Sequence, residues 1–178
     1  MGLVRTPEKV NLITGLIYND KTVAAKALKD LIRVFGDIDL ESPEIDFTYT
    51  RYYDAEFGKN LKRKFLGFKK TAGLDGIHKT KLVTNKLEDK YSISGKRRIN
   101  IDPGYIELSK LVLFSTKDFS HRIYLANGIY AEITLLFKDG HFTALPWTYP
   151  DYKSEEYLRI LESVRALYKN KVDEKRCL

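Results

Sequence analysis

Residues 10–36 have the sequence VNLITGLIYNDKTVAAKALKDLIRVFG, which predicts a buried strand followed by an amphipathic helix. Residues 10–18 form an apolar run of the length expected for a strand. From Val23 to Phe35 apolar residues recur at intervals of three and four, and Gly36 is a favourable residue for ending a helix. This strand and helix begin the order of elements from which we infer the fold.

The elements that follow extend this unit. Residues 45–50 alternate between apolar and polar, and residues 65–68 form a shorter candidate strand. A second helix is predicted over about residues 77–91, and a further strand over residues 98–102, which the Pro-Gly that follows should end. The order β-α-β-β-α-β predicts a ferredoxin-like half, in which two helices pack on one face of an antiparallel sheet.

The second half of the sequence predicts an antiparallel β-meander and a C-terminal helix. Residues 110–115 (KLVLFS) form an apolar strand, and Asn127-Gly128 and Asp139-Gly140 are typical two-residue hairpin turns. A closing helix is predicted over about residues 154–171. The predicted fold class is therefore α+β, as a single domain over residues 1–172 with a frayed tail at 173–178.

Composition narrows the class of protein. The chain has 178 residues, of which 43% are hydrophobic and 31% charged, which is ordinary globular usage. No apolar run approaches the roughly 18 to 20 residues of a membrane helix, and the N-terminal residues lack the apolar core of a signal peptide. We therefore expect a cytoplasmic protein with no membrane association. The single cysteine, Cys177, excludes an internal disulfide, no metal ligands or cofactor are predicted, and the oligomeric state is left open.

Basic residues are concentrated in one segment. Between Lys59 and Arg98 there are 13 Lys and Arg against 3 Asp and Glu, a local charge of +10 against +7 for the whole chain. Around residues 62–64 the cations are interleaved with aromatic residues, a combination that suits phosphate neutralisation and base stacking. The segment predicts binding of a nucleotide or RNA. The alternative is a solvated face whose aromatic residues belong to the core.

Two segments resemble phosphate-binding loops without meeting their requirements. Residues 15–22 have the spacing of a Walker A loop, but Asp20 stands where its second glycine belongs. Residues 73–80 repeat the spacing with His78 at that place. Glycine lets the backbone N–H groups curl round a phosphate, whereas a carboxylate repels it. The sequence therefore argues against a P-loop GTPase.

The turn at residues 127–128 predicts a register for the hairpin around it. With a two-residue loop Ala126 opposes Ile129, and counting outward makes His121 and Glu132 diagonal neighbours on the polar face. A carboxylate orients an imidazole and raises its pKa toward working pH, so the pair predicts general acid-base catalysis. The alternative is a structural pair on the wet face of a sheet. The predicted core side carries Tyr124, Ala126, Ile129, Ala131, Ile133, Leu135 and Phe137.

Several long polar and aromatic phrases run through the chain. They include NIDPGY at 100–105, STKD at 115–118, HRIYL at 121–125, GIYAE at 128–132 and WTYPDY at 147–152, with Tyr52-Tyr53, Glu56-Phe57-Gly58, Lys81 and Thr84-Asn85. Together they resemble a prokaryotic family catalogued as domain of unknown function 4416, some of whose members are labelled GTP-binding. The resemblance implies no defined activity, and the failed Walker loops argue against that label. It draws attention to the polar residues Asp102, Lys117, His121, Glu132 and Asp151.

These observations lead to two sets of candidate residues and three functions. The candidate catalytic residues are His121, Glu132 and Asp102. The leading hypothesis is binding of an anionic phosphate-bearing ligand, a nucleotide or RNA, through the basic face. The alternatives are a small hydrolase or transferase that uses His121 and Glu132, and an interaction module for an acidic protein. Asp151 has the simpler explanation of capping the last helix. The candidate ligand-binding residues are Lys117, Arg122, Lys81, Asn85, Asn100, Lys62, Arg63 and Lys64.

Overall fold

The computed structural model describes residues 2–50 and 52–176. Strands and helices alternate in the first part of the chain, a run of strands follows, and a long helix closes the fold. In chain order the elements are β1 (Val10–Tyr18), α1 (Lys21–Phe35), β2 (Ile38–Glu41), β3 (Ile45–Asp46), α2 (Asp54–Phe57), β4 (Lys62–Ala72), α3 (Lys79–Lys90), β5 (Ile99–Ile106), β6 (Lys110–Ser115), β7 (Arg122–Ala126), β8 (Ile129–Lys138), β9 (His141–Ala144), the 3-10 helix η1 (Asp151–Lys153) and α4 (Glu155–Arg176).

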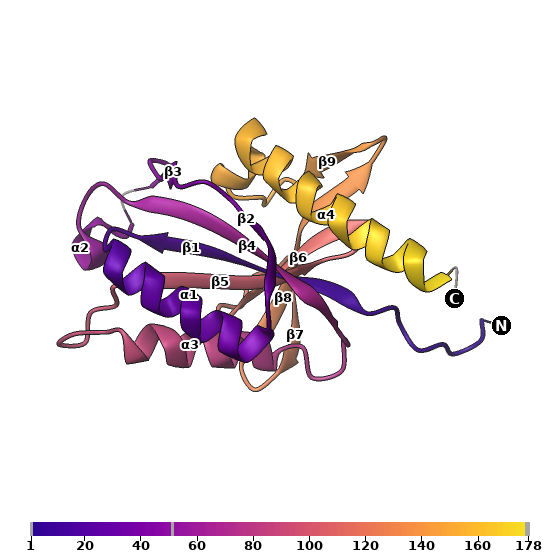
Figure 1. Ribbon diagram of the computed structural model, residues 1–178, viewed down its shortest axis with the longest axis horizontal. Coiled ribbons are helices and arrows are strands. Elements are labelled where there is room, and N and C mark those ends of the chain that lie inside the picture. The colour runs from indigo at the N-terminus through magenta and orange to yellow at the C-terminus, as the bar shows by residue number, and fades with distance from the viewer. Residues whose placement is uncertain (1, 51, 177–178) are drawn as a thin grey trace.

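The strands form one twisted sheet in which paired strands run antiparallel. Its order is β2-β4-β1-β5-β6-β8-β7, while β3 pairs with β4 and β9 with β8. The described residues thus build a nine-stranded sheet and four α-helices (Figure 1). The predicted α+β class is confirmed.

Helices cover both faces of the sheet. Val23, Ala27 and Leu31 of α1 pack with apolar residues of β1, β4 and β5. On the opposite face Tyr157 and Leu161 of α4 belong to a second core cluster. Successive residues of a strand point to opposite faces, so β1 contributes alternate side chains to the two clusters. Figure 1 shows the same division, with α1 and α3 on one side of the sheet and α4 on the other.

Strand lengths in the first half differ from the prediction. β4 covers residues 62–72 instead of 65–68, β3 is limited to residues 45–46, and β2 was not predicted. β2 is a four-residue edge strand whose side chains are half-buried or exposed, so it carries no strong apolar pattern. Short edge strands of this kind depend on the neighbouring strand rather than on their own sequence.

β5 does not end at Pro103, as was predicted, but continues to Ile106. The reason is the direction of the missing N–H group. The N–H of Ile101 points away from β1 and donates to Glu88 Oε1. Along a strand the N–H direction repeats every two residues, so the nitrogen of Pro103 also points away from β1. β6 pairs with β5 only from Gly104 onward, so no ladder bond is lost at the proline.

The β7–β8 hairpin keeps its predicted turn but not its predicted register. Ala126 opposes Ile129 as expected, whereas a β-bulge next to Ala126 shifts the following pairs by one residue. Arg122, instead of Ile123, therefore opposes Glu132. A bulge places one extra residue in a strand, which a count outward from the turn misses.

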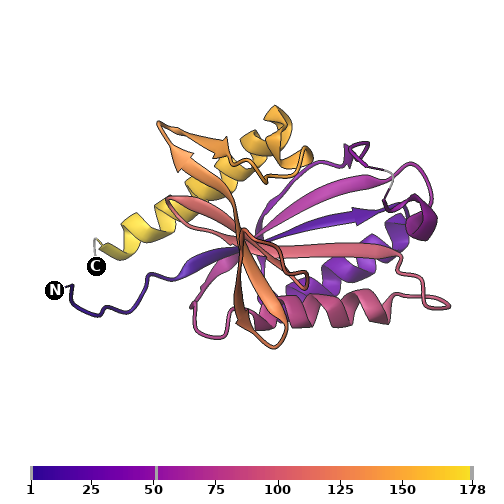
Figure 2. The same cartoon turned by 180° about the vertical axis from the view of Figure 1, so that it is seen from behind.

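The predicted core side of this hairpin is partly wrong. Tyr124 is 57% exposed. Ile129 and Ile133 join a cluster formed with β6, whereas Leu135 and Phe137 join the cluster under α4. The β6–β8 ladder contains a register shift between these two pairs, and such a shift reverses which face later residues occupy. Figure 2 shows how strongly this part of the sheet is twisted against the first part.

The last helix begins within a residue of its predicted start, but its cap and its end differ from the expectation. The Oγ of Ser154 accepts from the N–H of Tyr157 at 3.3 Å, so Ser154 and not Asp151 caps α4. α4 extends to Arg176, into the tail that was expected to be frayed. In the part of the chain that the structure describes, no helix is both long and apolar enough to cross a membrane.

Candidate functional site

A cleft of about 780 Å³ brings together side chains from both halves of the chain. Its walls are supplied by the segment between β3 and α2, by α3, by β4 and β5, by β6 to β8, and by the segment that leads into η1. These elements lie far apart in the sequence. The cleft is therefore a product of the tertiary fold.

The cleft exists because β5 and β6 pair along only part of their length. Their ladder covers Gly104–Ile106 on β5, and the preceding part of that strand has no strand on its outer side. Two side chains of α3 bond that free edge instead: Glu88 Oε1 accepts from the N–H of Ile101 at 2.7 Å, and Lys81 Nζ donates to its carbonyl oxygen at 3.1 Å. α3 thus takes the place of a strand and holds the two sheet segments apart.

Arg63 forms the buried base of the cleft. Its side chain is 2% exposed, and Nη2 donates to Asp151 Oδ2 at 2.7 Å while Nη1 donates to Asp102 Oδ2 at 3.3 Å. Gly15 lies beside it on the neighbouring strand β1, and a Cβ on that residue would lie 2.7 Å from Nη1. The guanidinium also lies over four aromatic rings at 5.3 to 5.7 Å, those of Phe47, Phe65, Tyr152 and Tyr157.

Arg63 keeps its positive charge although it is buried, because it is paired with two carboxylates. Burial by itself lowers the pKa of Arg63, but Tyr152, Asp102 and Asp151 more than offset that effect and hold the pKa well above its ordinary value. Burial raises the pKa of Tyr157 to about 12 despite the nearby cation. Arg63 is therefore a permanent positive charge that fixes the position of two carboxylates.

A second ionic network lies at the α3 wall. Arg97 donates to both carboxylate oxygens of Glu56 at 2.8 Å, and its Nη1 donates to Glu88 Oε2 and Asn100 Oδ1 at 3.0 Å. Burial raises the pKa of Glu88, while Lys81, the N–H of Ile101 and Arg97 act in the opposite direction. The hydrogen bonds to Glu56 and then those to Glu88 raise the pKa of Arg97. Through Arg97 the network links α2, α3 and β5.

The third charged group lies where β7 and β8 meet the cleft. Glu132 is 3% exposed. Its Oε2 accepts from Arg122 Nε at 2.8 Å and also lies 3.0 Å from His121 Nε2. Arg122 is held further by Ser115 Oγ and by the carbonyl oxygen of Lys117, each at 2.9 Å. The His121 ring is stacked between Phe119 and Trp147, with ring centroids 5.8 and 5.3 Å away.

Aromatic side chains form the mouth of the cleft. Tyr49, Tyr52 and Tyr149 line it and are 42%, 65% and 50% exposed. Lys117 Nζ lies 5.1 Å from the centre of the Tyr52 ring. An exposed ring with a cation beside it provides a stacking surface next to a positive charge.

The structure brings most of the predicted site residues together. Eight of them line the cleft, and His121 contacts it through Glu132. Whether any of them is catalytic stays a prediction. The eight are Arg63, Lys81, Asn85, Asn100, Asp102, Lys117, Arg122 and Glu132.

Lys62 and Lys64 are not part of this arrangement. They flank Arg63 on β4, and alternate residues of a strand point to opposite faces. Lys62 Nζ pairs with Asp46 at 2.5 Å and Lys64 Nζ with Glu41 at 2.6 Å. The run at residues 62–64 is therefore not one basic surface, since its central residue is buried and the outer two are paired elsewhere.

Some cleft residues were missed from the sequence. Glu88 and Arg97 organise the α3 wall, and Tyr49, Tyr52 and Tyr149 form the mouth. Tyr52 and Tyr149 lie in phrases that were noted, but nothing in their spacing indicated a shared site. Among the described residues no group of three or more His, Cys, Asp or Glu side chains is placed to hold a metal ion.

Fold and site together define an α+β protein with one polar, aromatic-lined cleft built from segments throughout the chain. The sequence matches the family described as Domain of unknown function (DUF4416) over residues 8–168, and the chain belongs to that family. The matched range includes every residue of the cleft. No curated protein and no solved structure matches the chain.

Proposed function

We propose that the cleft binds a small phosphate-bearing ligand of the nucleotide class. The observation that carries this proposal is the convergence of exposed tyrosines, unpaired amide groups and cations in one cleft of about 780 Å³. Ligand sites in proteins have volumes of roughly 300 to 1,000 Å³ and combine apolar walls with a few polar groups. A nucleotide matches that combination because it joins a planar base to a charged phosphate.

The aromatic mouth supports stacking of a base, and Lys117 supports contact with the phosphate. Lys117 Nζ has no hydrogen bond or ion pair with another described residue, and it lies beside the Tyr52 ring. A base stacked on Tyr52 would place its phosphate within reach of that ammonium group. Base stacking on an aromatic side chain contributes roughly 1 to 3 kcal/mol.

Two asparagines provide hydrogen-bonding groups that the protein does not use. Asn100 is 5% exposed, and its Nδ2 is buried without a partner, while its Oδ1 accepts from Arg97. Asn85 also lines the cleft, and no bond of its side chain to another described residue is present. A buried donor without a partner costs free energy, which a ligand acceptor would recover.

The charge balance of the cleft favours a ligand with a single phosphate. Its lining contains five Lys and Arg and five Asp and Glu, so the cleft as a whole is neutral and the basic face expected from the sequence is absent here. Most of these charges neutralise one another, which leaves Lys117 as the cation that is free to bind. A triphosphate would bring several negative charges close to Asp89 and Asp102. We therefore expect monophosphates to bind more tightly than triphosphates.

Isothermal titration calorimetry with a nucleoside, its monophosphate and its triphosphate tests the proposal. The monophosphate should bind most tightly, and Lys117→Ala should weaken its binding about tenfold, since loss of one charge-assisted contact is worth roughly 1.5 kcal/mol. Lys138→Ala is the matched control, because Lys138 is 76% exposed in the β8–β9 hairpin. Equal binding by the nucleoside and the monophosphate, or unchanged binding by Lys117→Ala, would contradict the proposal.

A second candidate, a hydrolase or transferase, is supported by the 3.0 Å contact between His121 Nε2 and Glu132 Oε2. Glu132 positions the ring, and the ring's Nδ1 is left to act on a proton of a bound substrate. Turnover of nucleotides and other phosphoesters should then depend on His121. His121→Gln should abolish it, whereas Phe119→Leu, which removes a ring beside His121 and Arg122 but leaves the imidazole in place, should retain it. Equal turnover by wild type and His121→Gln would exclude this candidate.

We also infer a ferredoxin-like arrangement of the first half and a cytoplasmic location. A ferredoxin-like arrangement of the first half is supported by the order β2-β4-β1-β5 and by the position of α1 and α3 on one face. A cytoplasmic location is supported by the near absence of cysteine from the sequence.

A further inference from the structure

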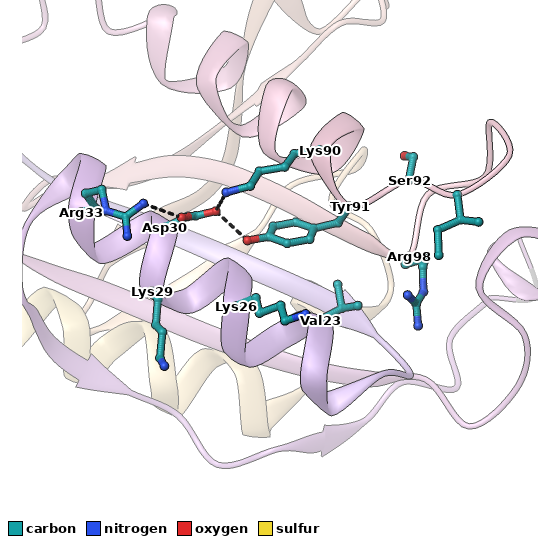
Figure 3. Close-up of a pocket in the computed structure, with 10 residues that line it drawn as sticks. Val23, Lys26, Lys29, Asp30, Arg33, Lys90, Tyr91, Ser92 and Arg98 are labelled. Carbon is teal, nitrogen blue, oxygen red and sulfur yellow. Dashed lines mark hydrogen bonds and ion pairs between the residues drawn. The ribbon is translucent and has the colours of Figure 1, made fainter.

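A second concave surface, of about 550 Å³, lies between α1 and the C-terminal end of α3. Figure 3 shows Asp30 toward one end of it, with Lys26 and Arg98 lying further along it. α1 and α3 cover the face of the sheet opposite α4, and we call this surface the α1–α3 groove (Figure 1). Its charged side chains are Lys26, Lys29, Arg33, Lys90, Arg98 and Asp30.

The single carboxylate does not neutralise the groove. Asp30 is 7% exposed and accepts from Lys90 Nζ and the Tyr91 hydroxyl at 2.5 Å and from Arg33 Nη1 at 3.1 Å. In Figure 3 Arg33 reaches it from one side and Lys90 with Tyr91 from the other. Arg98 bonds Asp20 outside the groove. The five Lys and Arg side chains of the groove therefore face two carboxylates, Asp30 and Asp20, which leaves a local charge of +3.

The cations on α1 are arranged at a cost to the helix. Lys26, Lys29 and Arg33 follow one another at intervals of three and four residues, so they lie along one face, where like charges repel. Lys26 and Lys29 are exposed, and neither has a hydrogen bond or ion pair with another described residue. An external anion that bridges the row would remove this repulsion.

The shape of this row indicates a linear anion. Arg33 lies seven positions after Lys26 in the helix, which corresponds to roughly 10 Å along the axis. A single phosphate cannot span that length, whereas a nucleic-acid strand carries one phosphate per nucleotide, so successive phosphates can reach successive cations of the row. Ile93, which is 58% exposed at the edge of the groove, adds an apolar surface that a base can cover.

We propose that the α1–α3 groove binds the phosphodiester backbone of single-stranded nucleic acid. This surface differs from the run at residues 62–64, whose lysines are already paired with acidic side chains. It also differs from the cleft, with which it shares no lining residue. The groove is therefore a separate candidate site from the cleft.

Fluorescence anisotropy with a labelled 20-nucleotide RNA, measured at several salt concentrations, tests the proposal. Lys26→Glu/Lys29→Glu is the informative variant, because neither side chain is bonded to another described residue in the folded protein. For wild type the affinity should fall as salt rises, and the double variant should reduce the slope of log K against log salt by about 1.4, which corresponds to two lost phosphate contacts at roughly 0.7 each. Lys138→Glu/Lys153→Glu makes the same change of charge on other exposed segments.

The control should bind RNA as wild type does, apart from a small general effect of net charge, and circular dichroism should show both variants folded. Labelled single-stranded DNA should respond to the variants as RNA does. Equal weakening by the two double variants, or no RNA binding at low salt, would overturn the proposal. Binding of anionic vesicles or of an acidic protein that is lost in Lys26→Glu/Lys29→Glu, without RNA binding, would also overturn it and assign the groove to that partner.

Discussion

Arg63 on β4 and Asp151 in η1 are 88 residues apart in the sequence, yet Arg63 Nη2 donates to Asp151 Oδ2 at 2.7 Å in the buried base of the cleft. Asp102 on β5 completes the group. Three separate segments are thus tied to one guanidinium. Because a buried charge without its partner is strongly unfavourable, this contact affects both the stability of the fold and the shape of the cleft.

Removal of the charge on Asp151 should destabilise the protein. Asp151→Asn leaves Arg63 with Asp102 as its remaining carboxylate, and loss of one partner from a buried ion pair costs roughly 3 to 5 kcal/mol. Asp46→Asn is the control, since Asp46 is 75% exposed and pairs with Lys62 at the surface. Urea unfolding should show a large shift for Asp151→Asn and almost none for Asp46→Asn. Similar shifts for the two variants would refute the role given to Arg63.

The junction of β5 with β6 should not tolerate a side chain at residue 104. A Cβ on Gly104 would lie 2.2 Å from the carbonyl oxygen of Val112, which belongs to the paired strand and cannot move independently. Gly104→Ala should lower the free energy of unfolding by roughly 3 kcal/mol, the upper part of the range for overpacking. Gly73→Ala is the control, because nothing lies within 4 Å of its added Cβ. A stable Gly104→Ala protein would mean that the two strands are further apart than described.

Asp30 should make stability depend on pH in the acid range. Hydrogen bonds from Lys90 and then Tyr91 hold the pKa of Asp30 below its ordinary value. A carboxyl with a lowered folded-state pKa stabilises the protein above its unfolded value, near pH 4, and that stabilisation is lost as pH falls through the folded-state value. The difference in unfolding free energy between wild type and Asp30→Asn should therefore be constant at pH 5.5 to 7 and shrink below about pH 4.

Lys90→Met removes the first of these donors and provides the matching test. It should raise the pKa of Asp30 toward its ordinary value and reduce the acid-range slope, as measured by urea unfolding at each pH. A difference between wild type and Asp30→Asn that grows as pH falls would show that the sign assigned to this carboxyl is wrong.

Glu132 should be required to hold His121 and Arg122 in place. Glu132→Gln keeps the shape of the side chain but leaves Arg122, whose side chain is 5% exposed, without its counter-charge. We expect a loss of roughly 3 kcal/mol in urea unfolding. Glu155→Gln removes an exposed pair with Arg159 on α4 and should cost at most about 0.5 kcal/mol. An equally small effect at Glu132 would mean that Arg122 finds other acceptors.

The sequence predicted elements wherever the pattern was local. The strand Lys110–Ser115 has its predicted bounds, and the turns at Asn127-Gly128 and Asp139-Gly140 lie where expected. Apolar periodicity also located α1 and α3 to within a few residues. Where a strand's existence or length depends on the strand beside it, the sequence-based prediction is wrong: β2 is not predicted, and the predicted end of β5 comes too early.

The candidate site shows the same limit. Eight of its lining residues could be named from the sequence, and the contact between His121 and Glu132 is present although the predicted register was wrong. The bulge that changed this register leaves no recognisable pattern in the residues around it. The roles of Arg97 and of the exposed tyrosines were not predictable, because they depend on segments that meet only after the sheet has formed.

By itself, then, the sequence determined the α+β class, the order of most elements and the identity of many polar residues, because periodicity and turn chemistry act over a few residues. The tertiary structure alone decided that Arg63 is buried between two carboxylates while Lys62 and Lys64 face elsewhere. It also decided that α3 replaces a strand beside β5 and so opens the cleft. Such contacts depend on the register and twist of strands that are distant in the chain, and no local pattern encodes them.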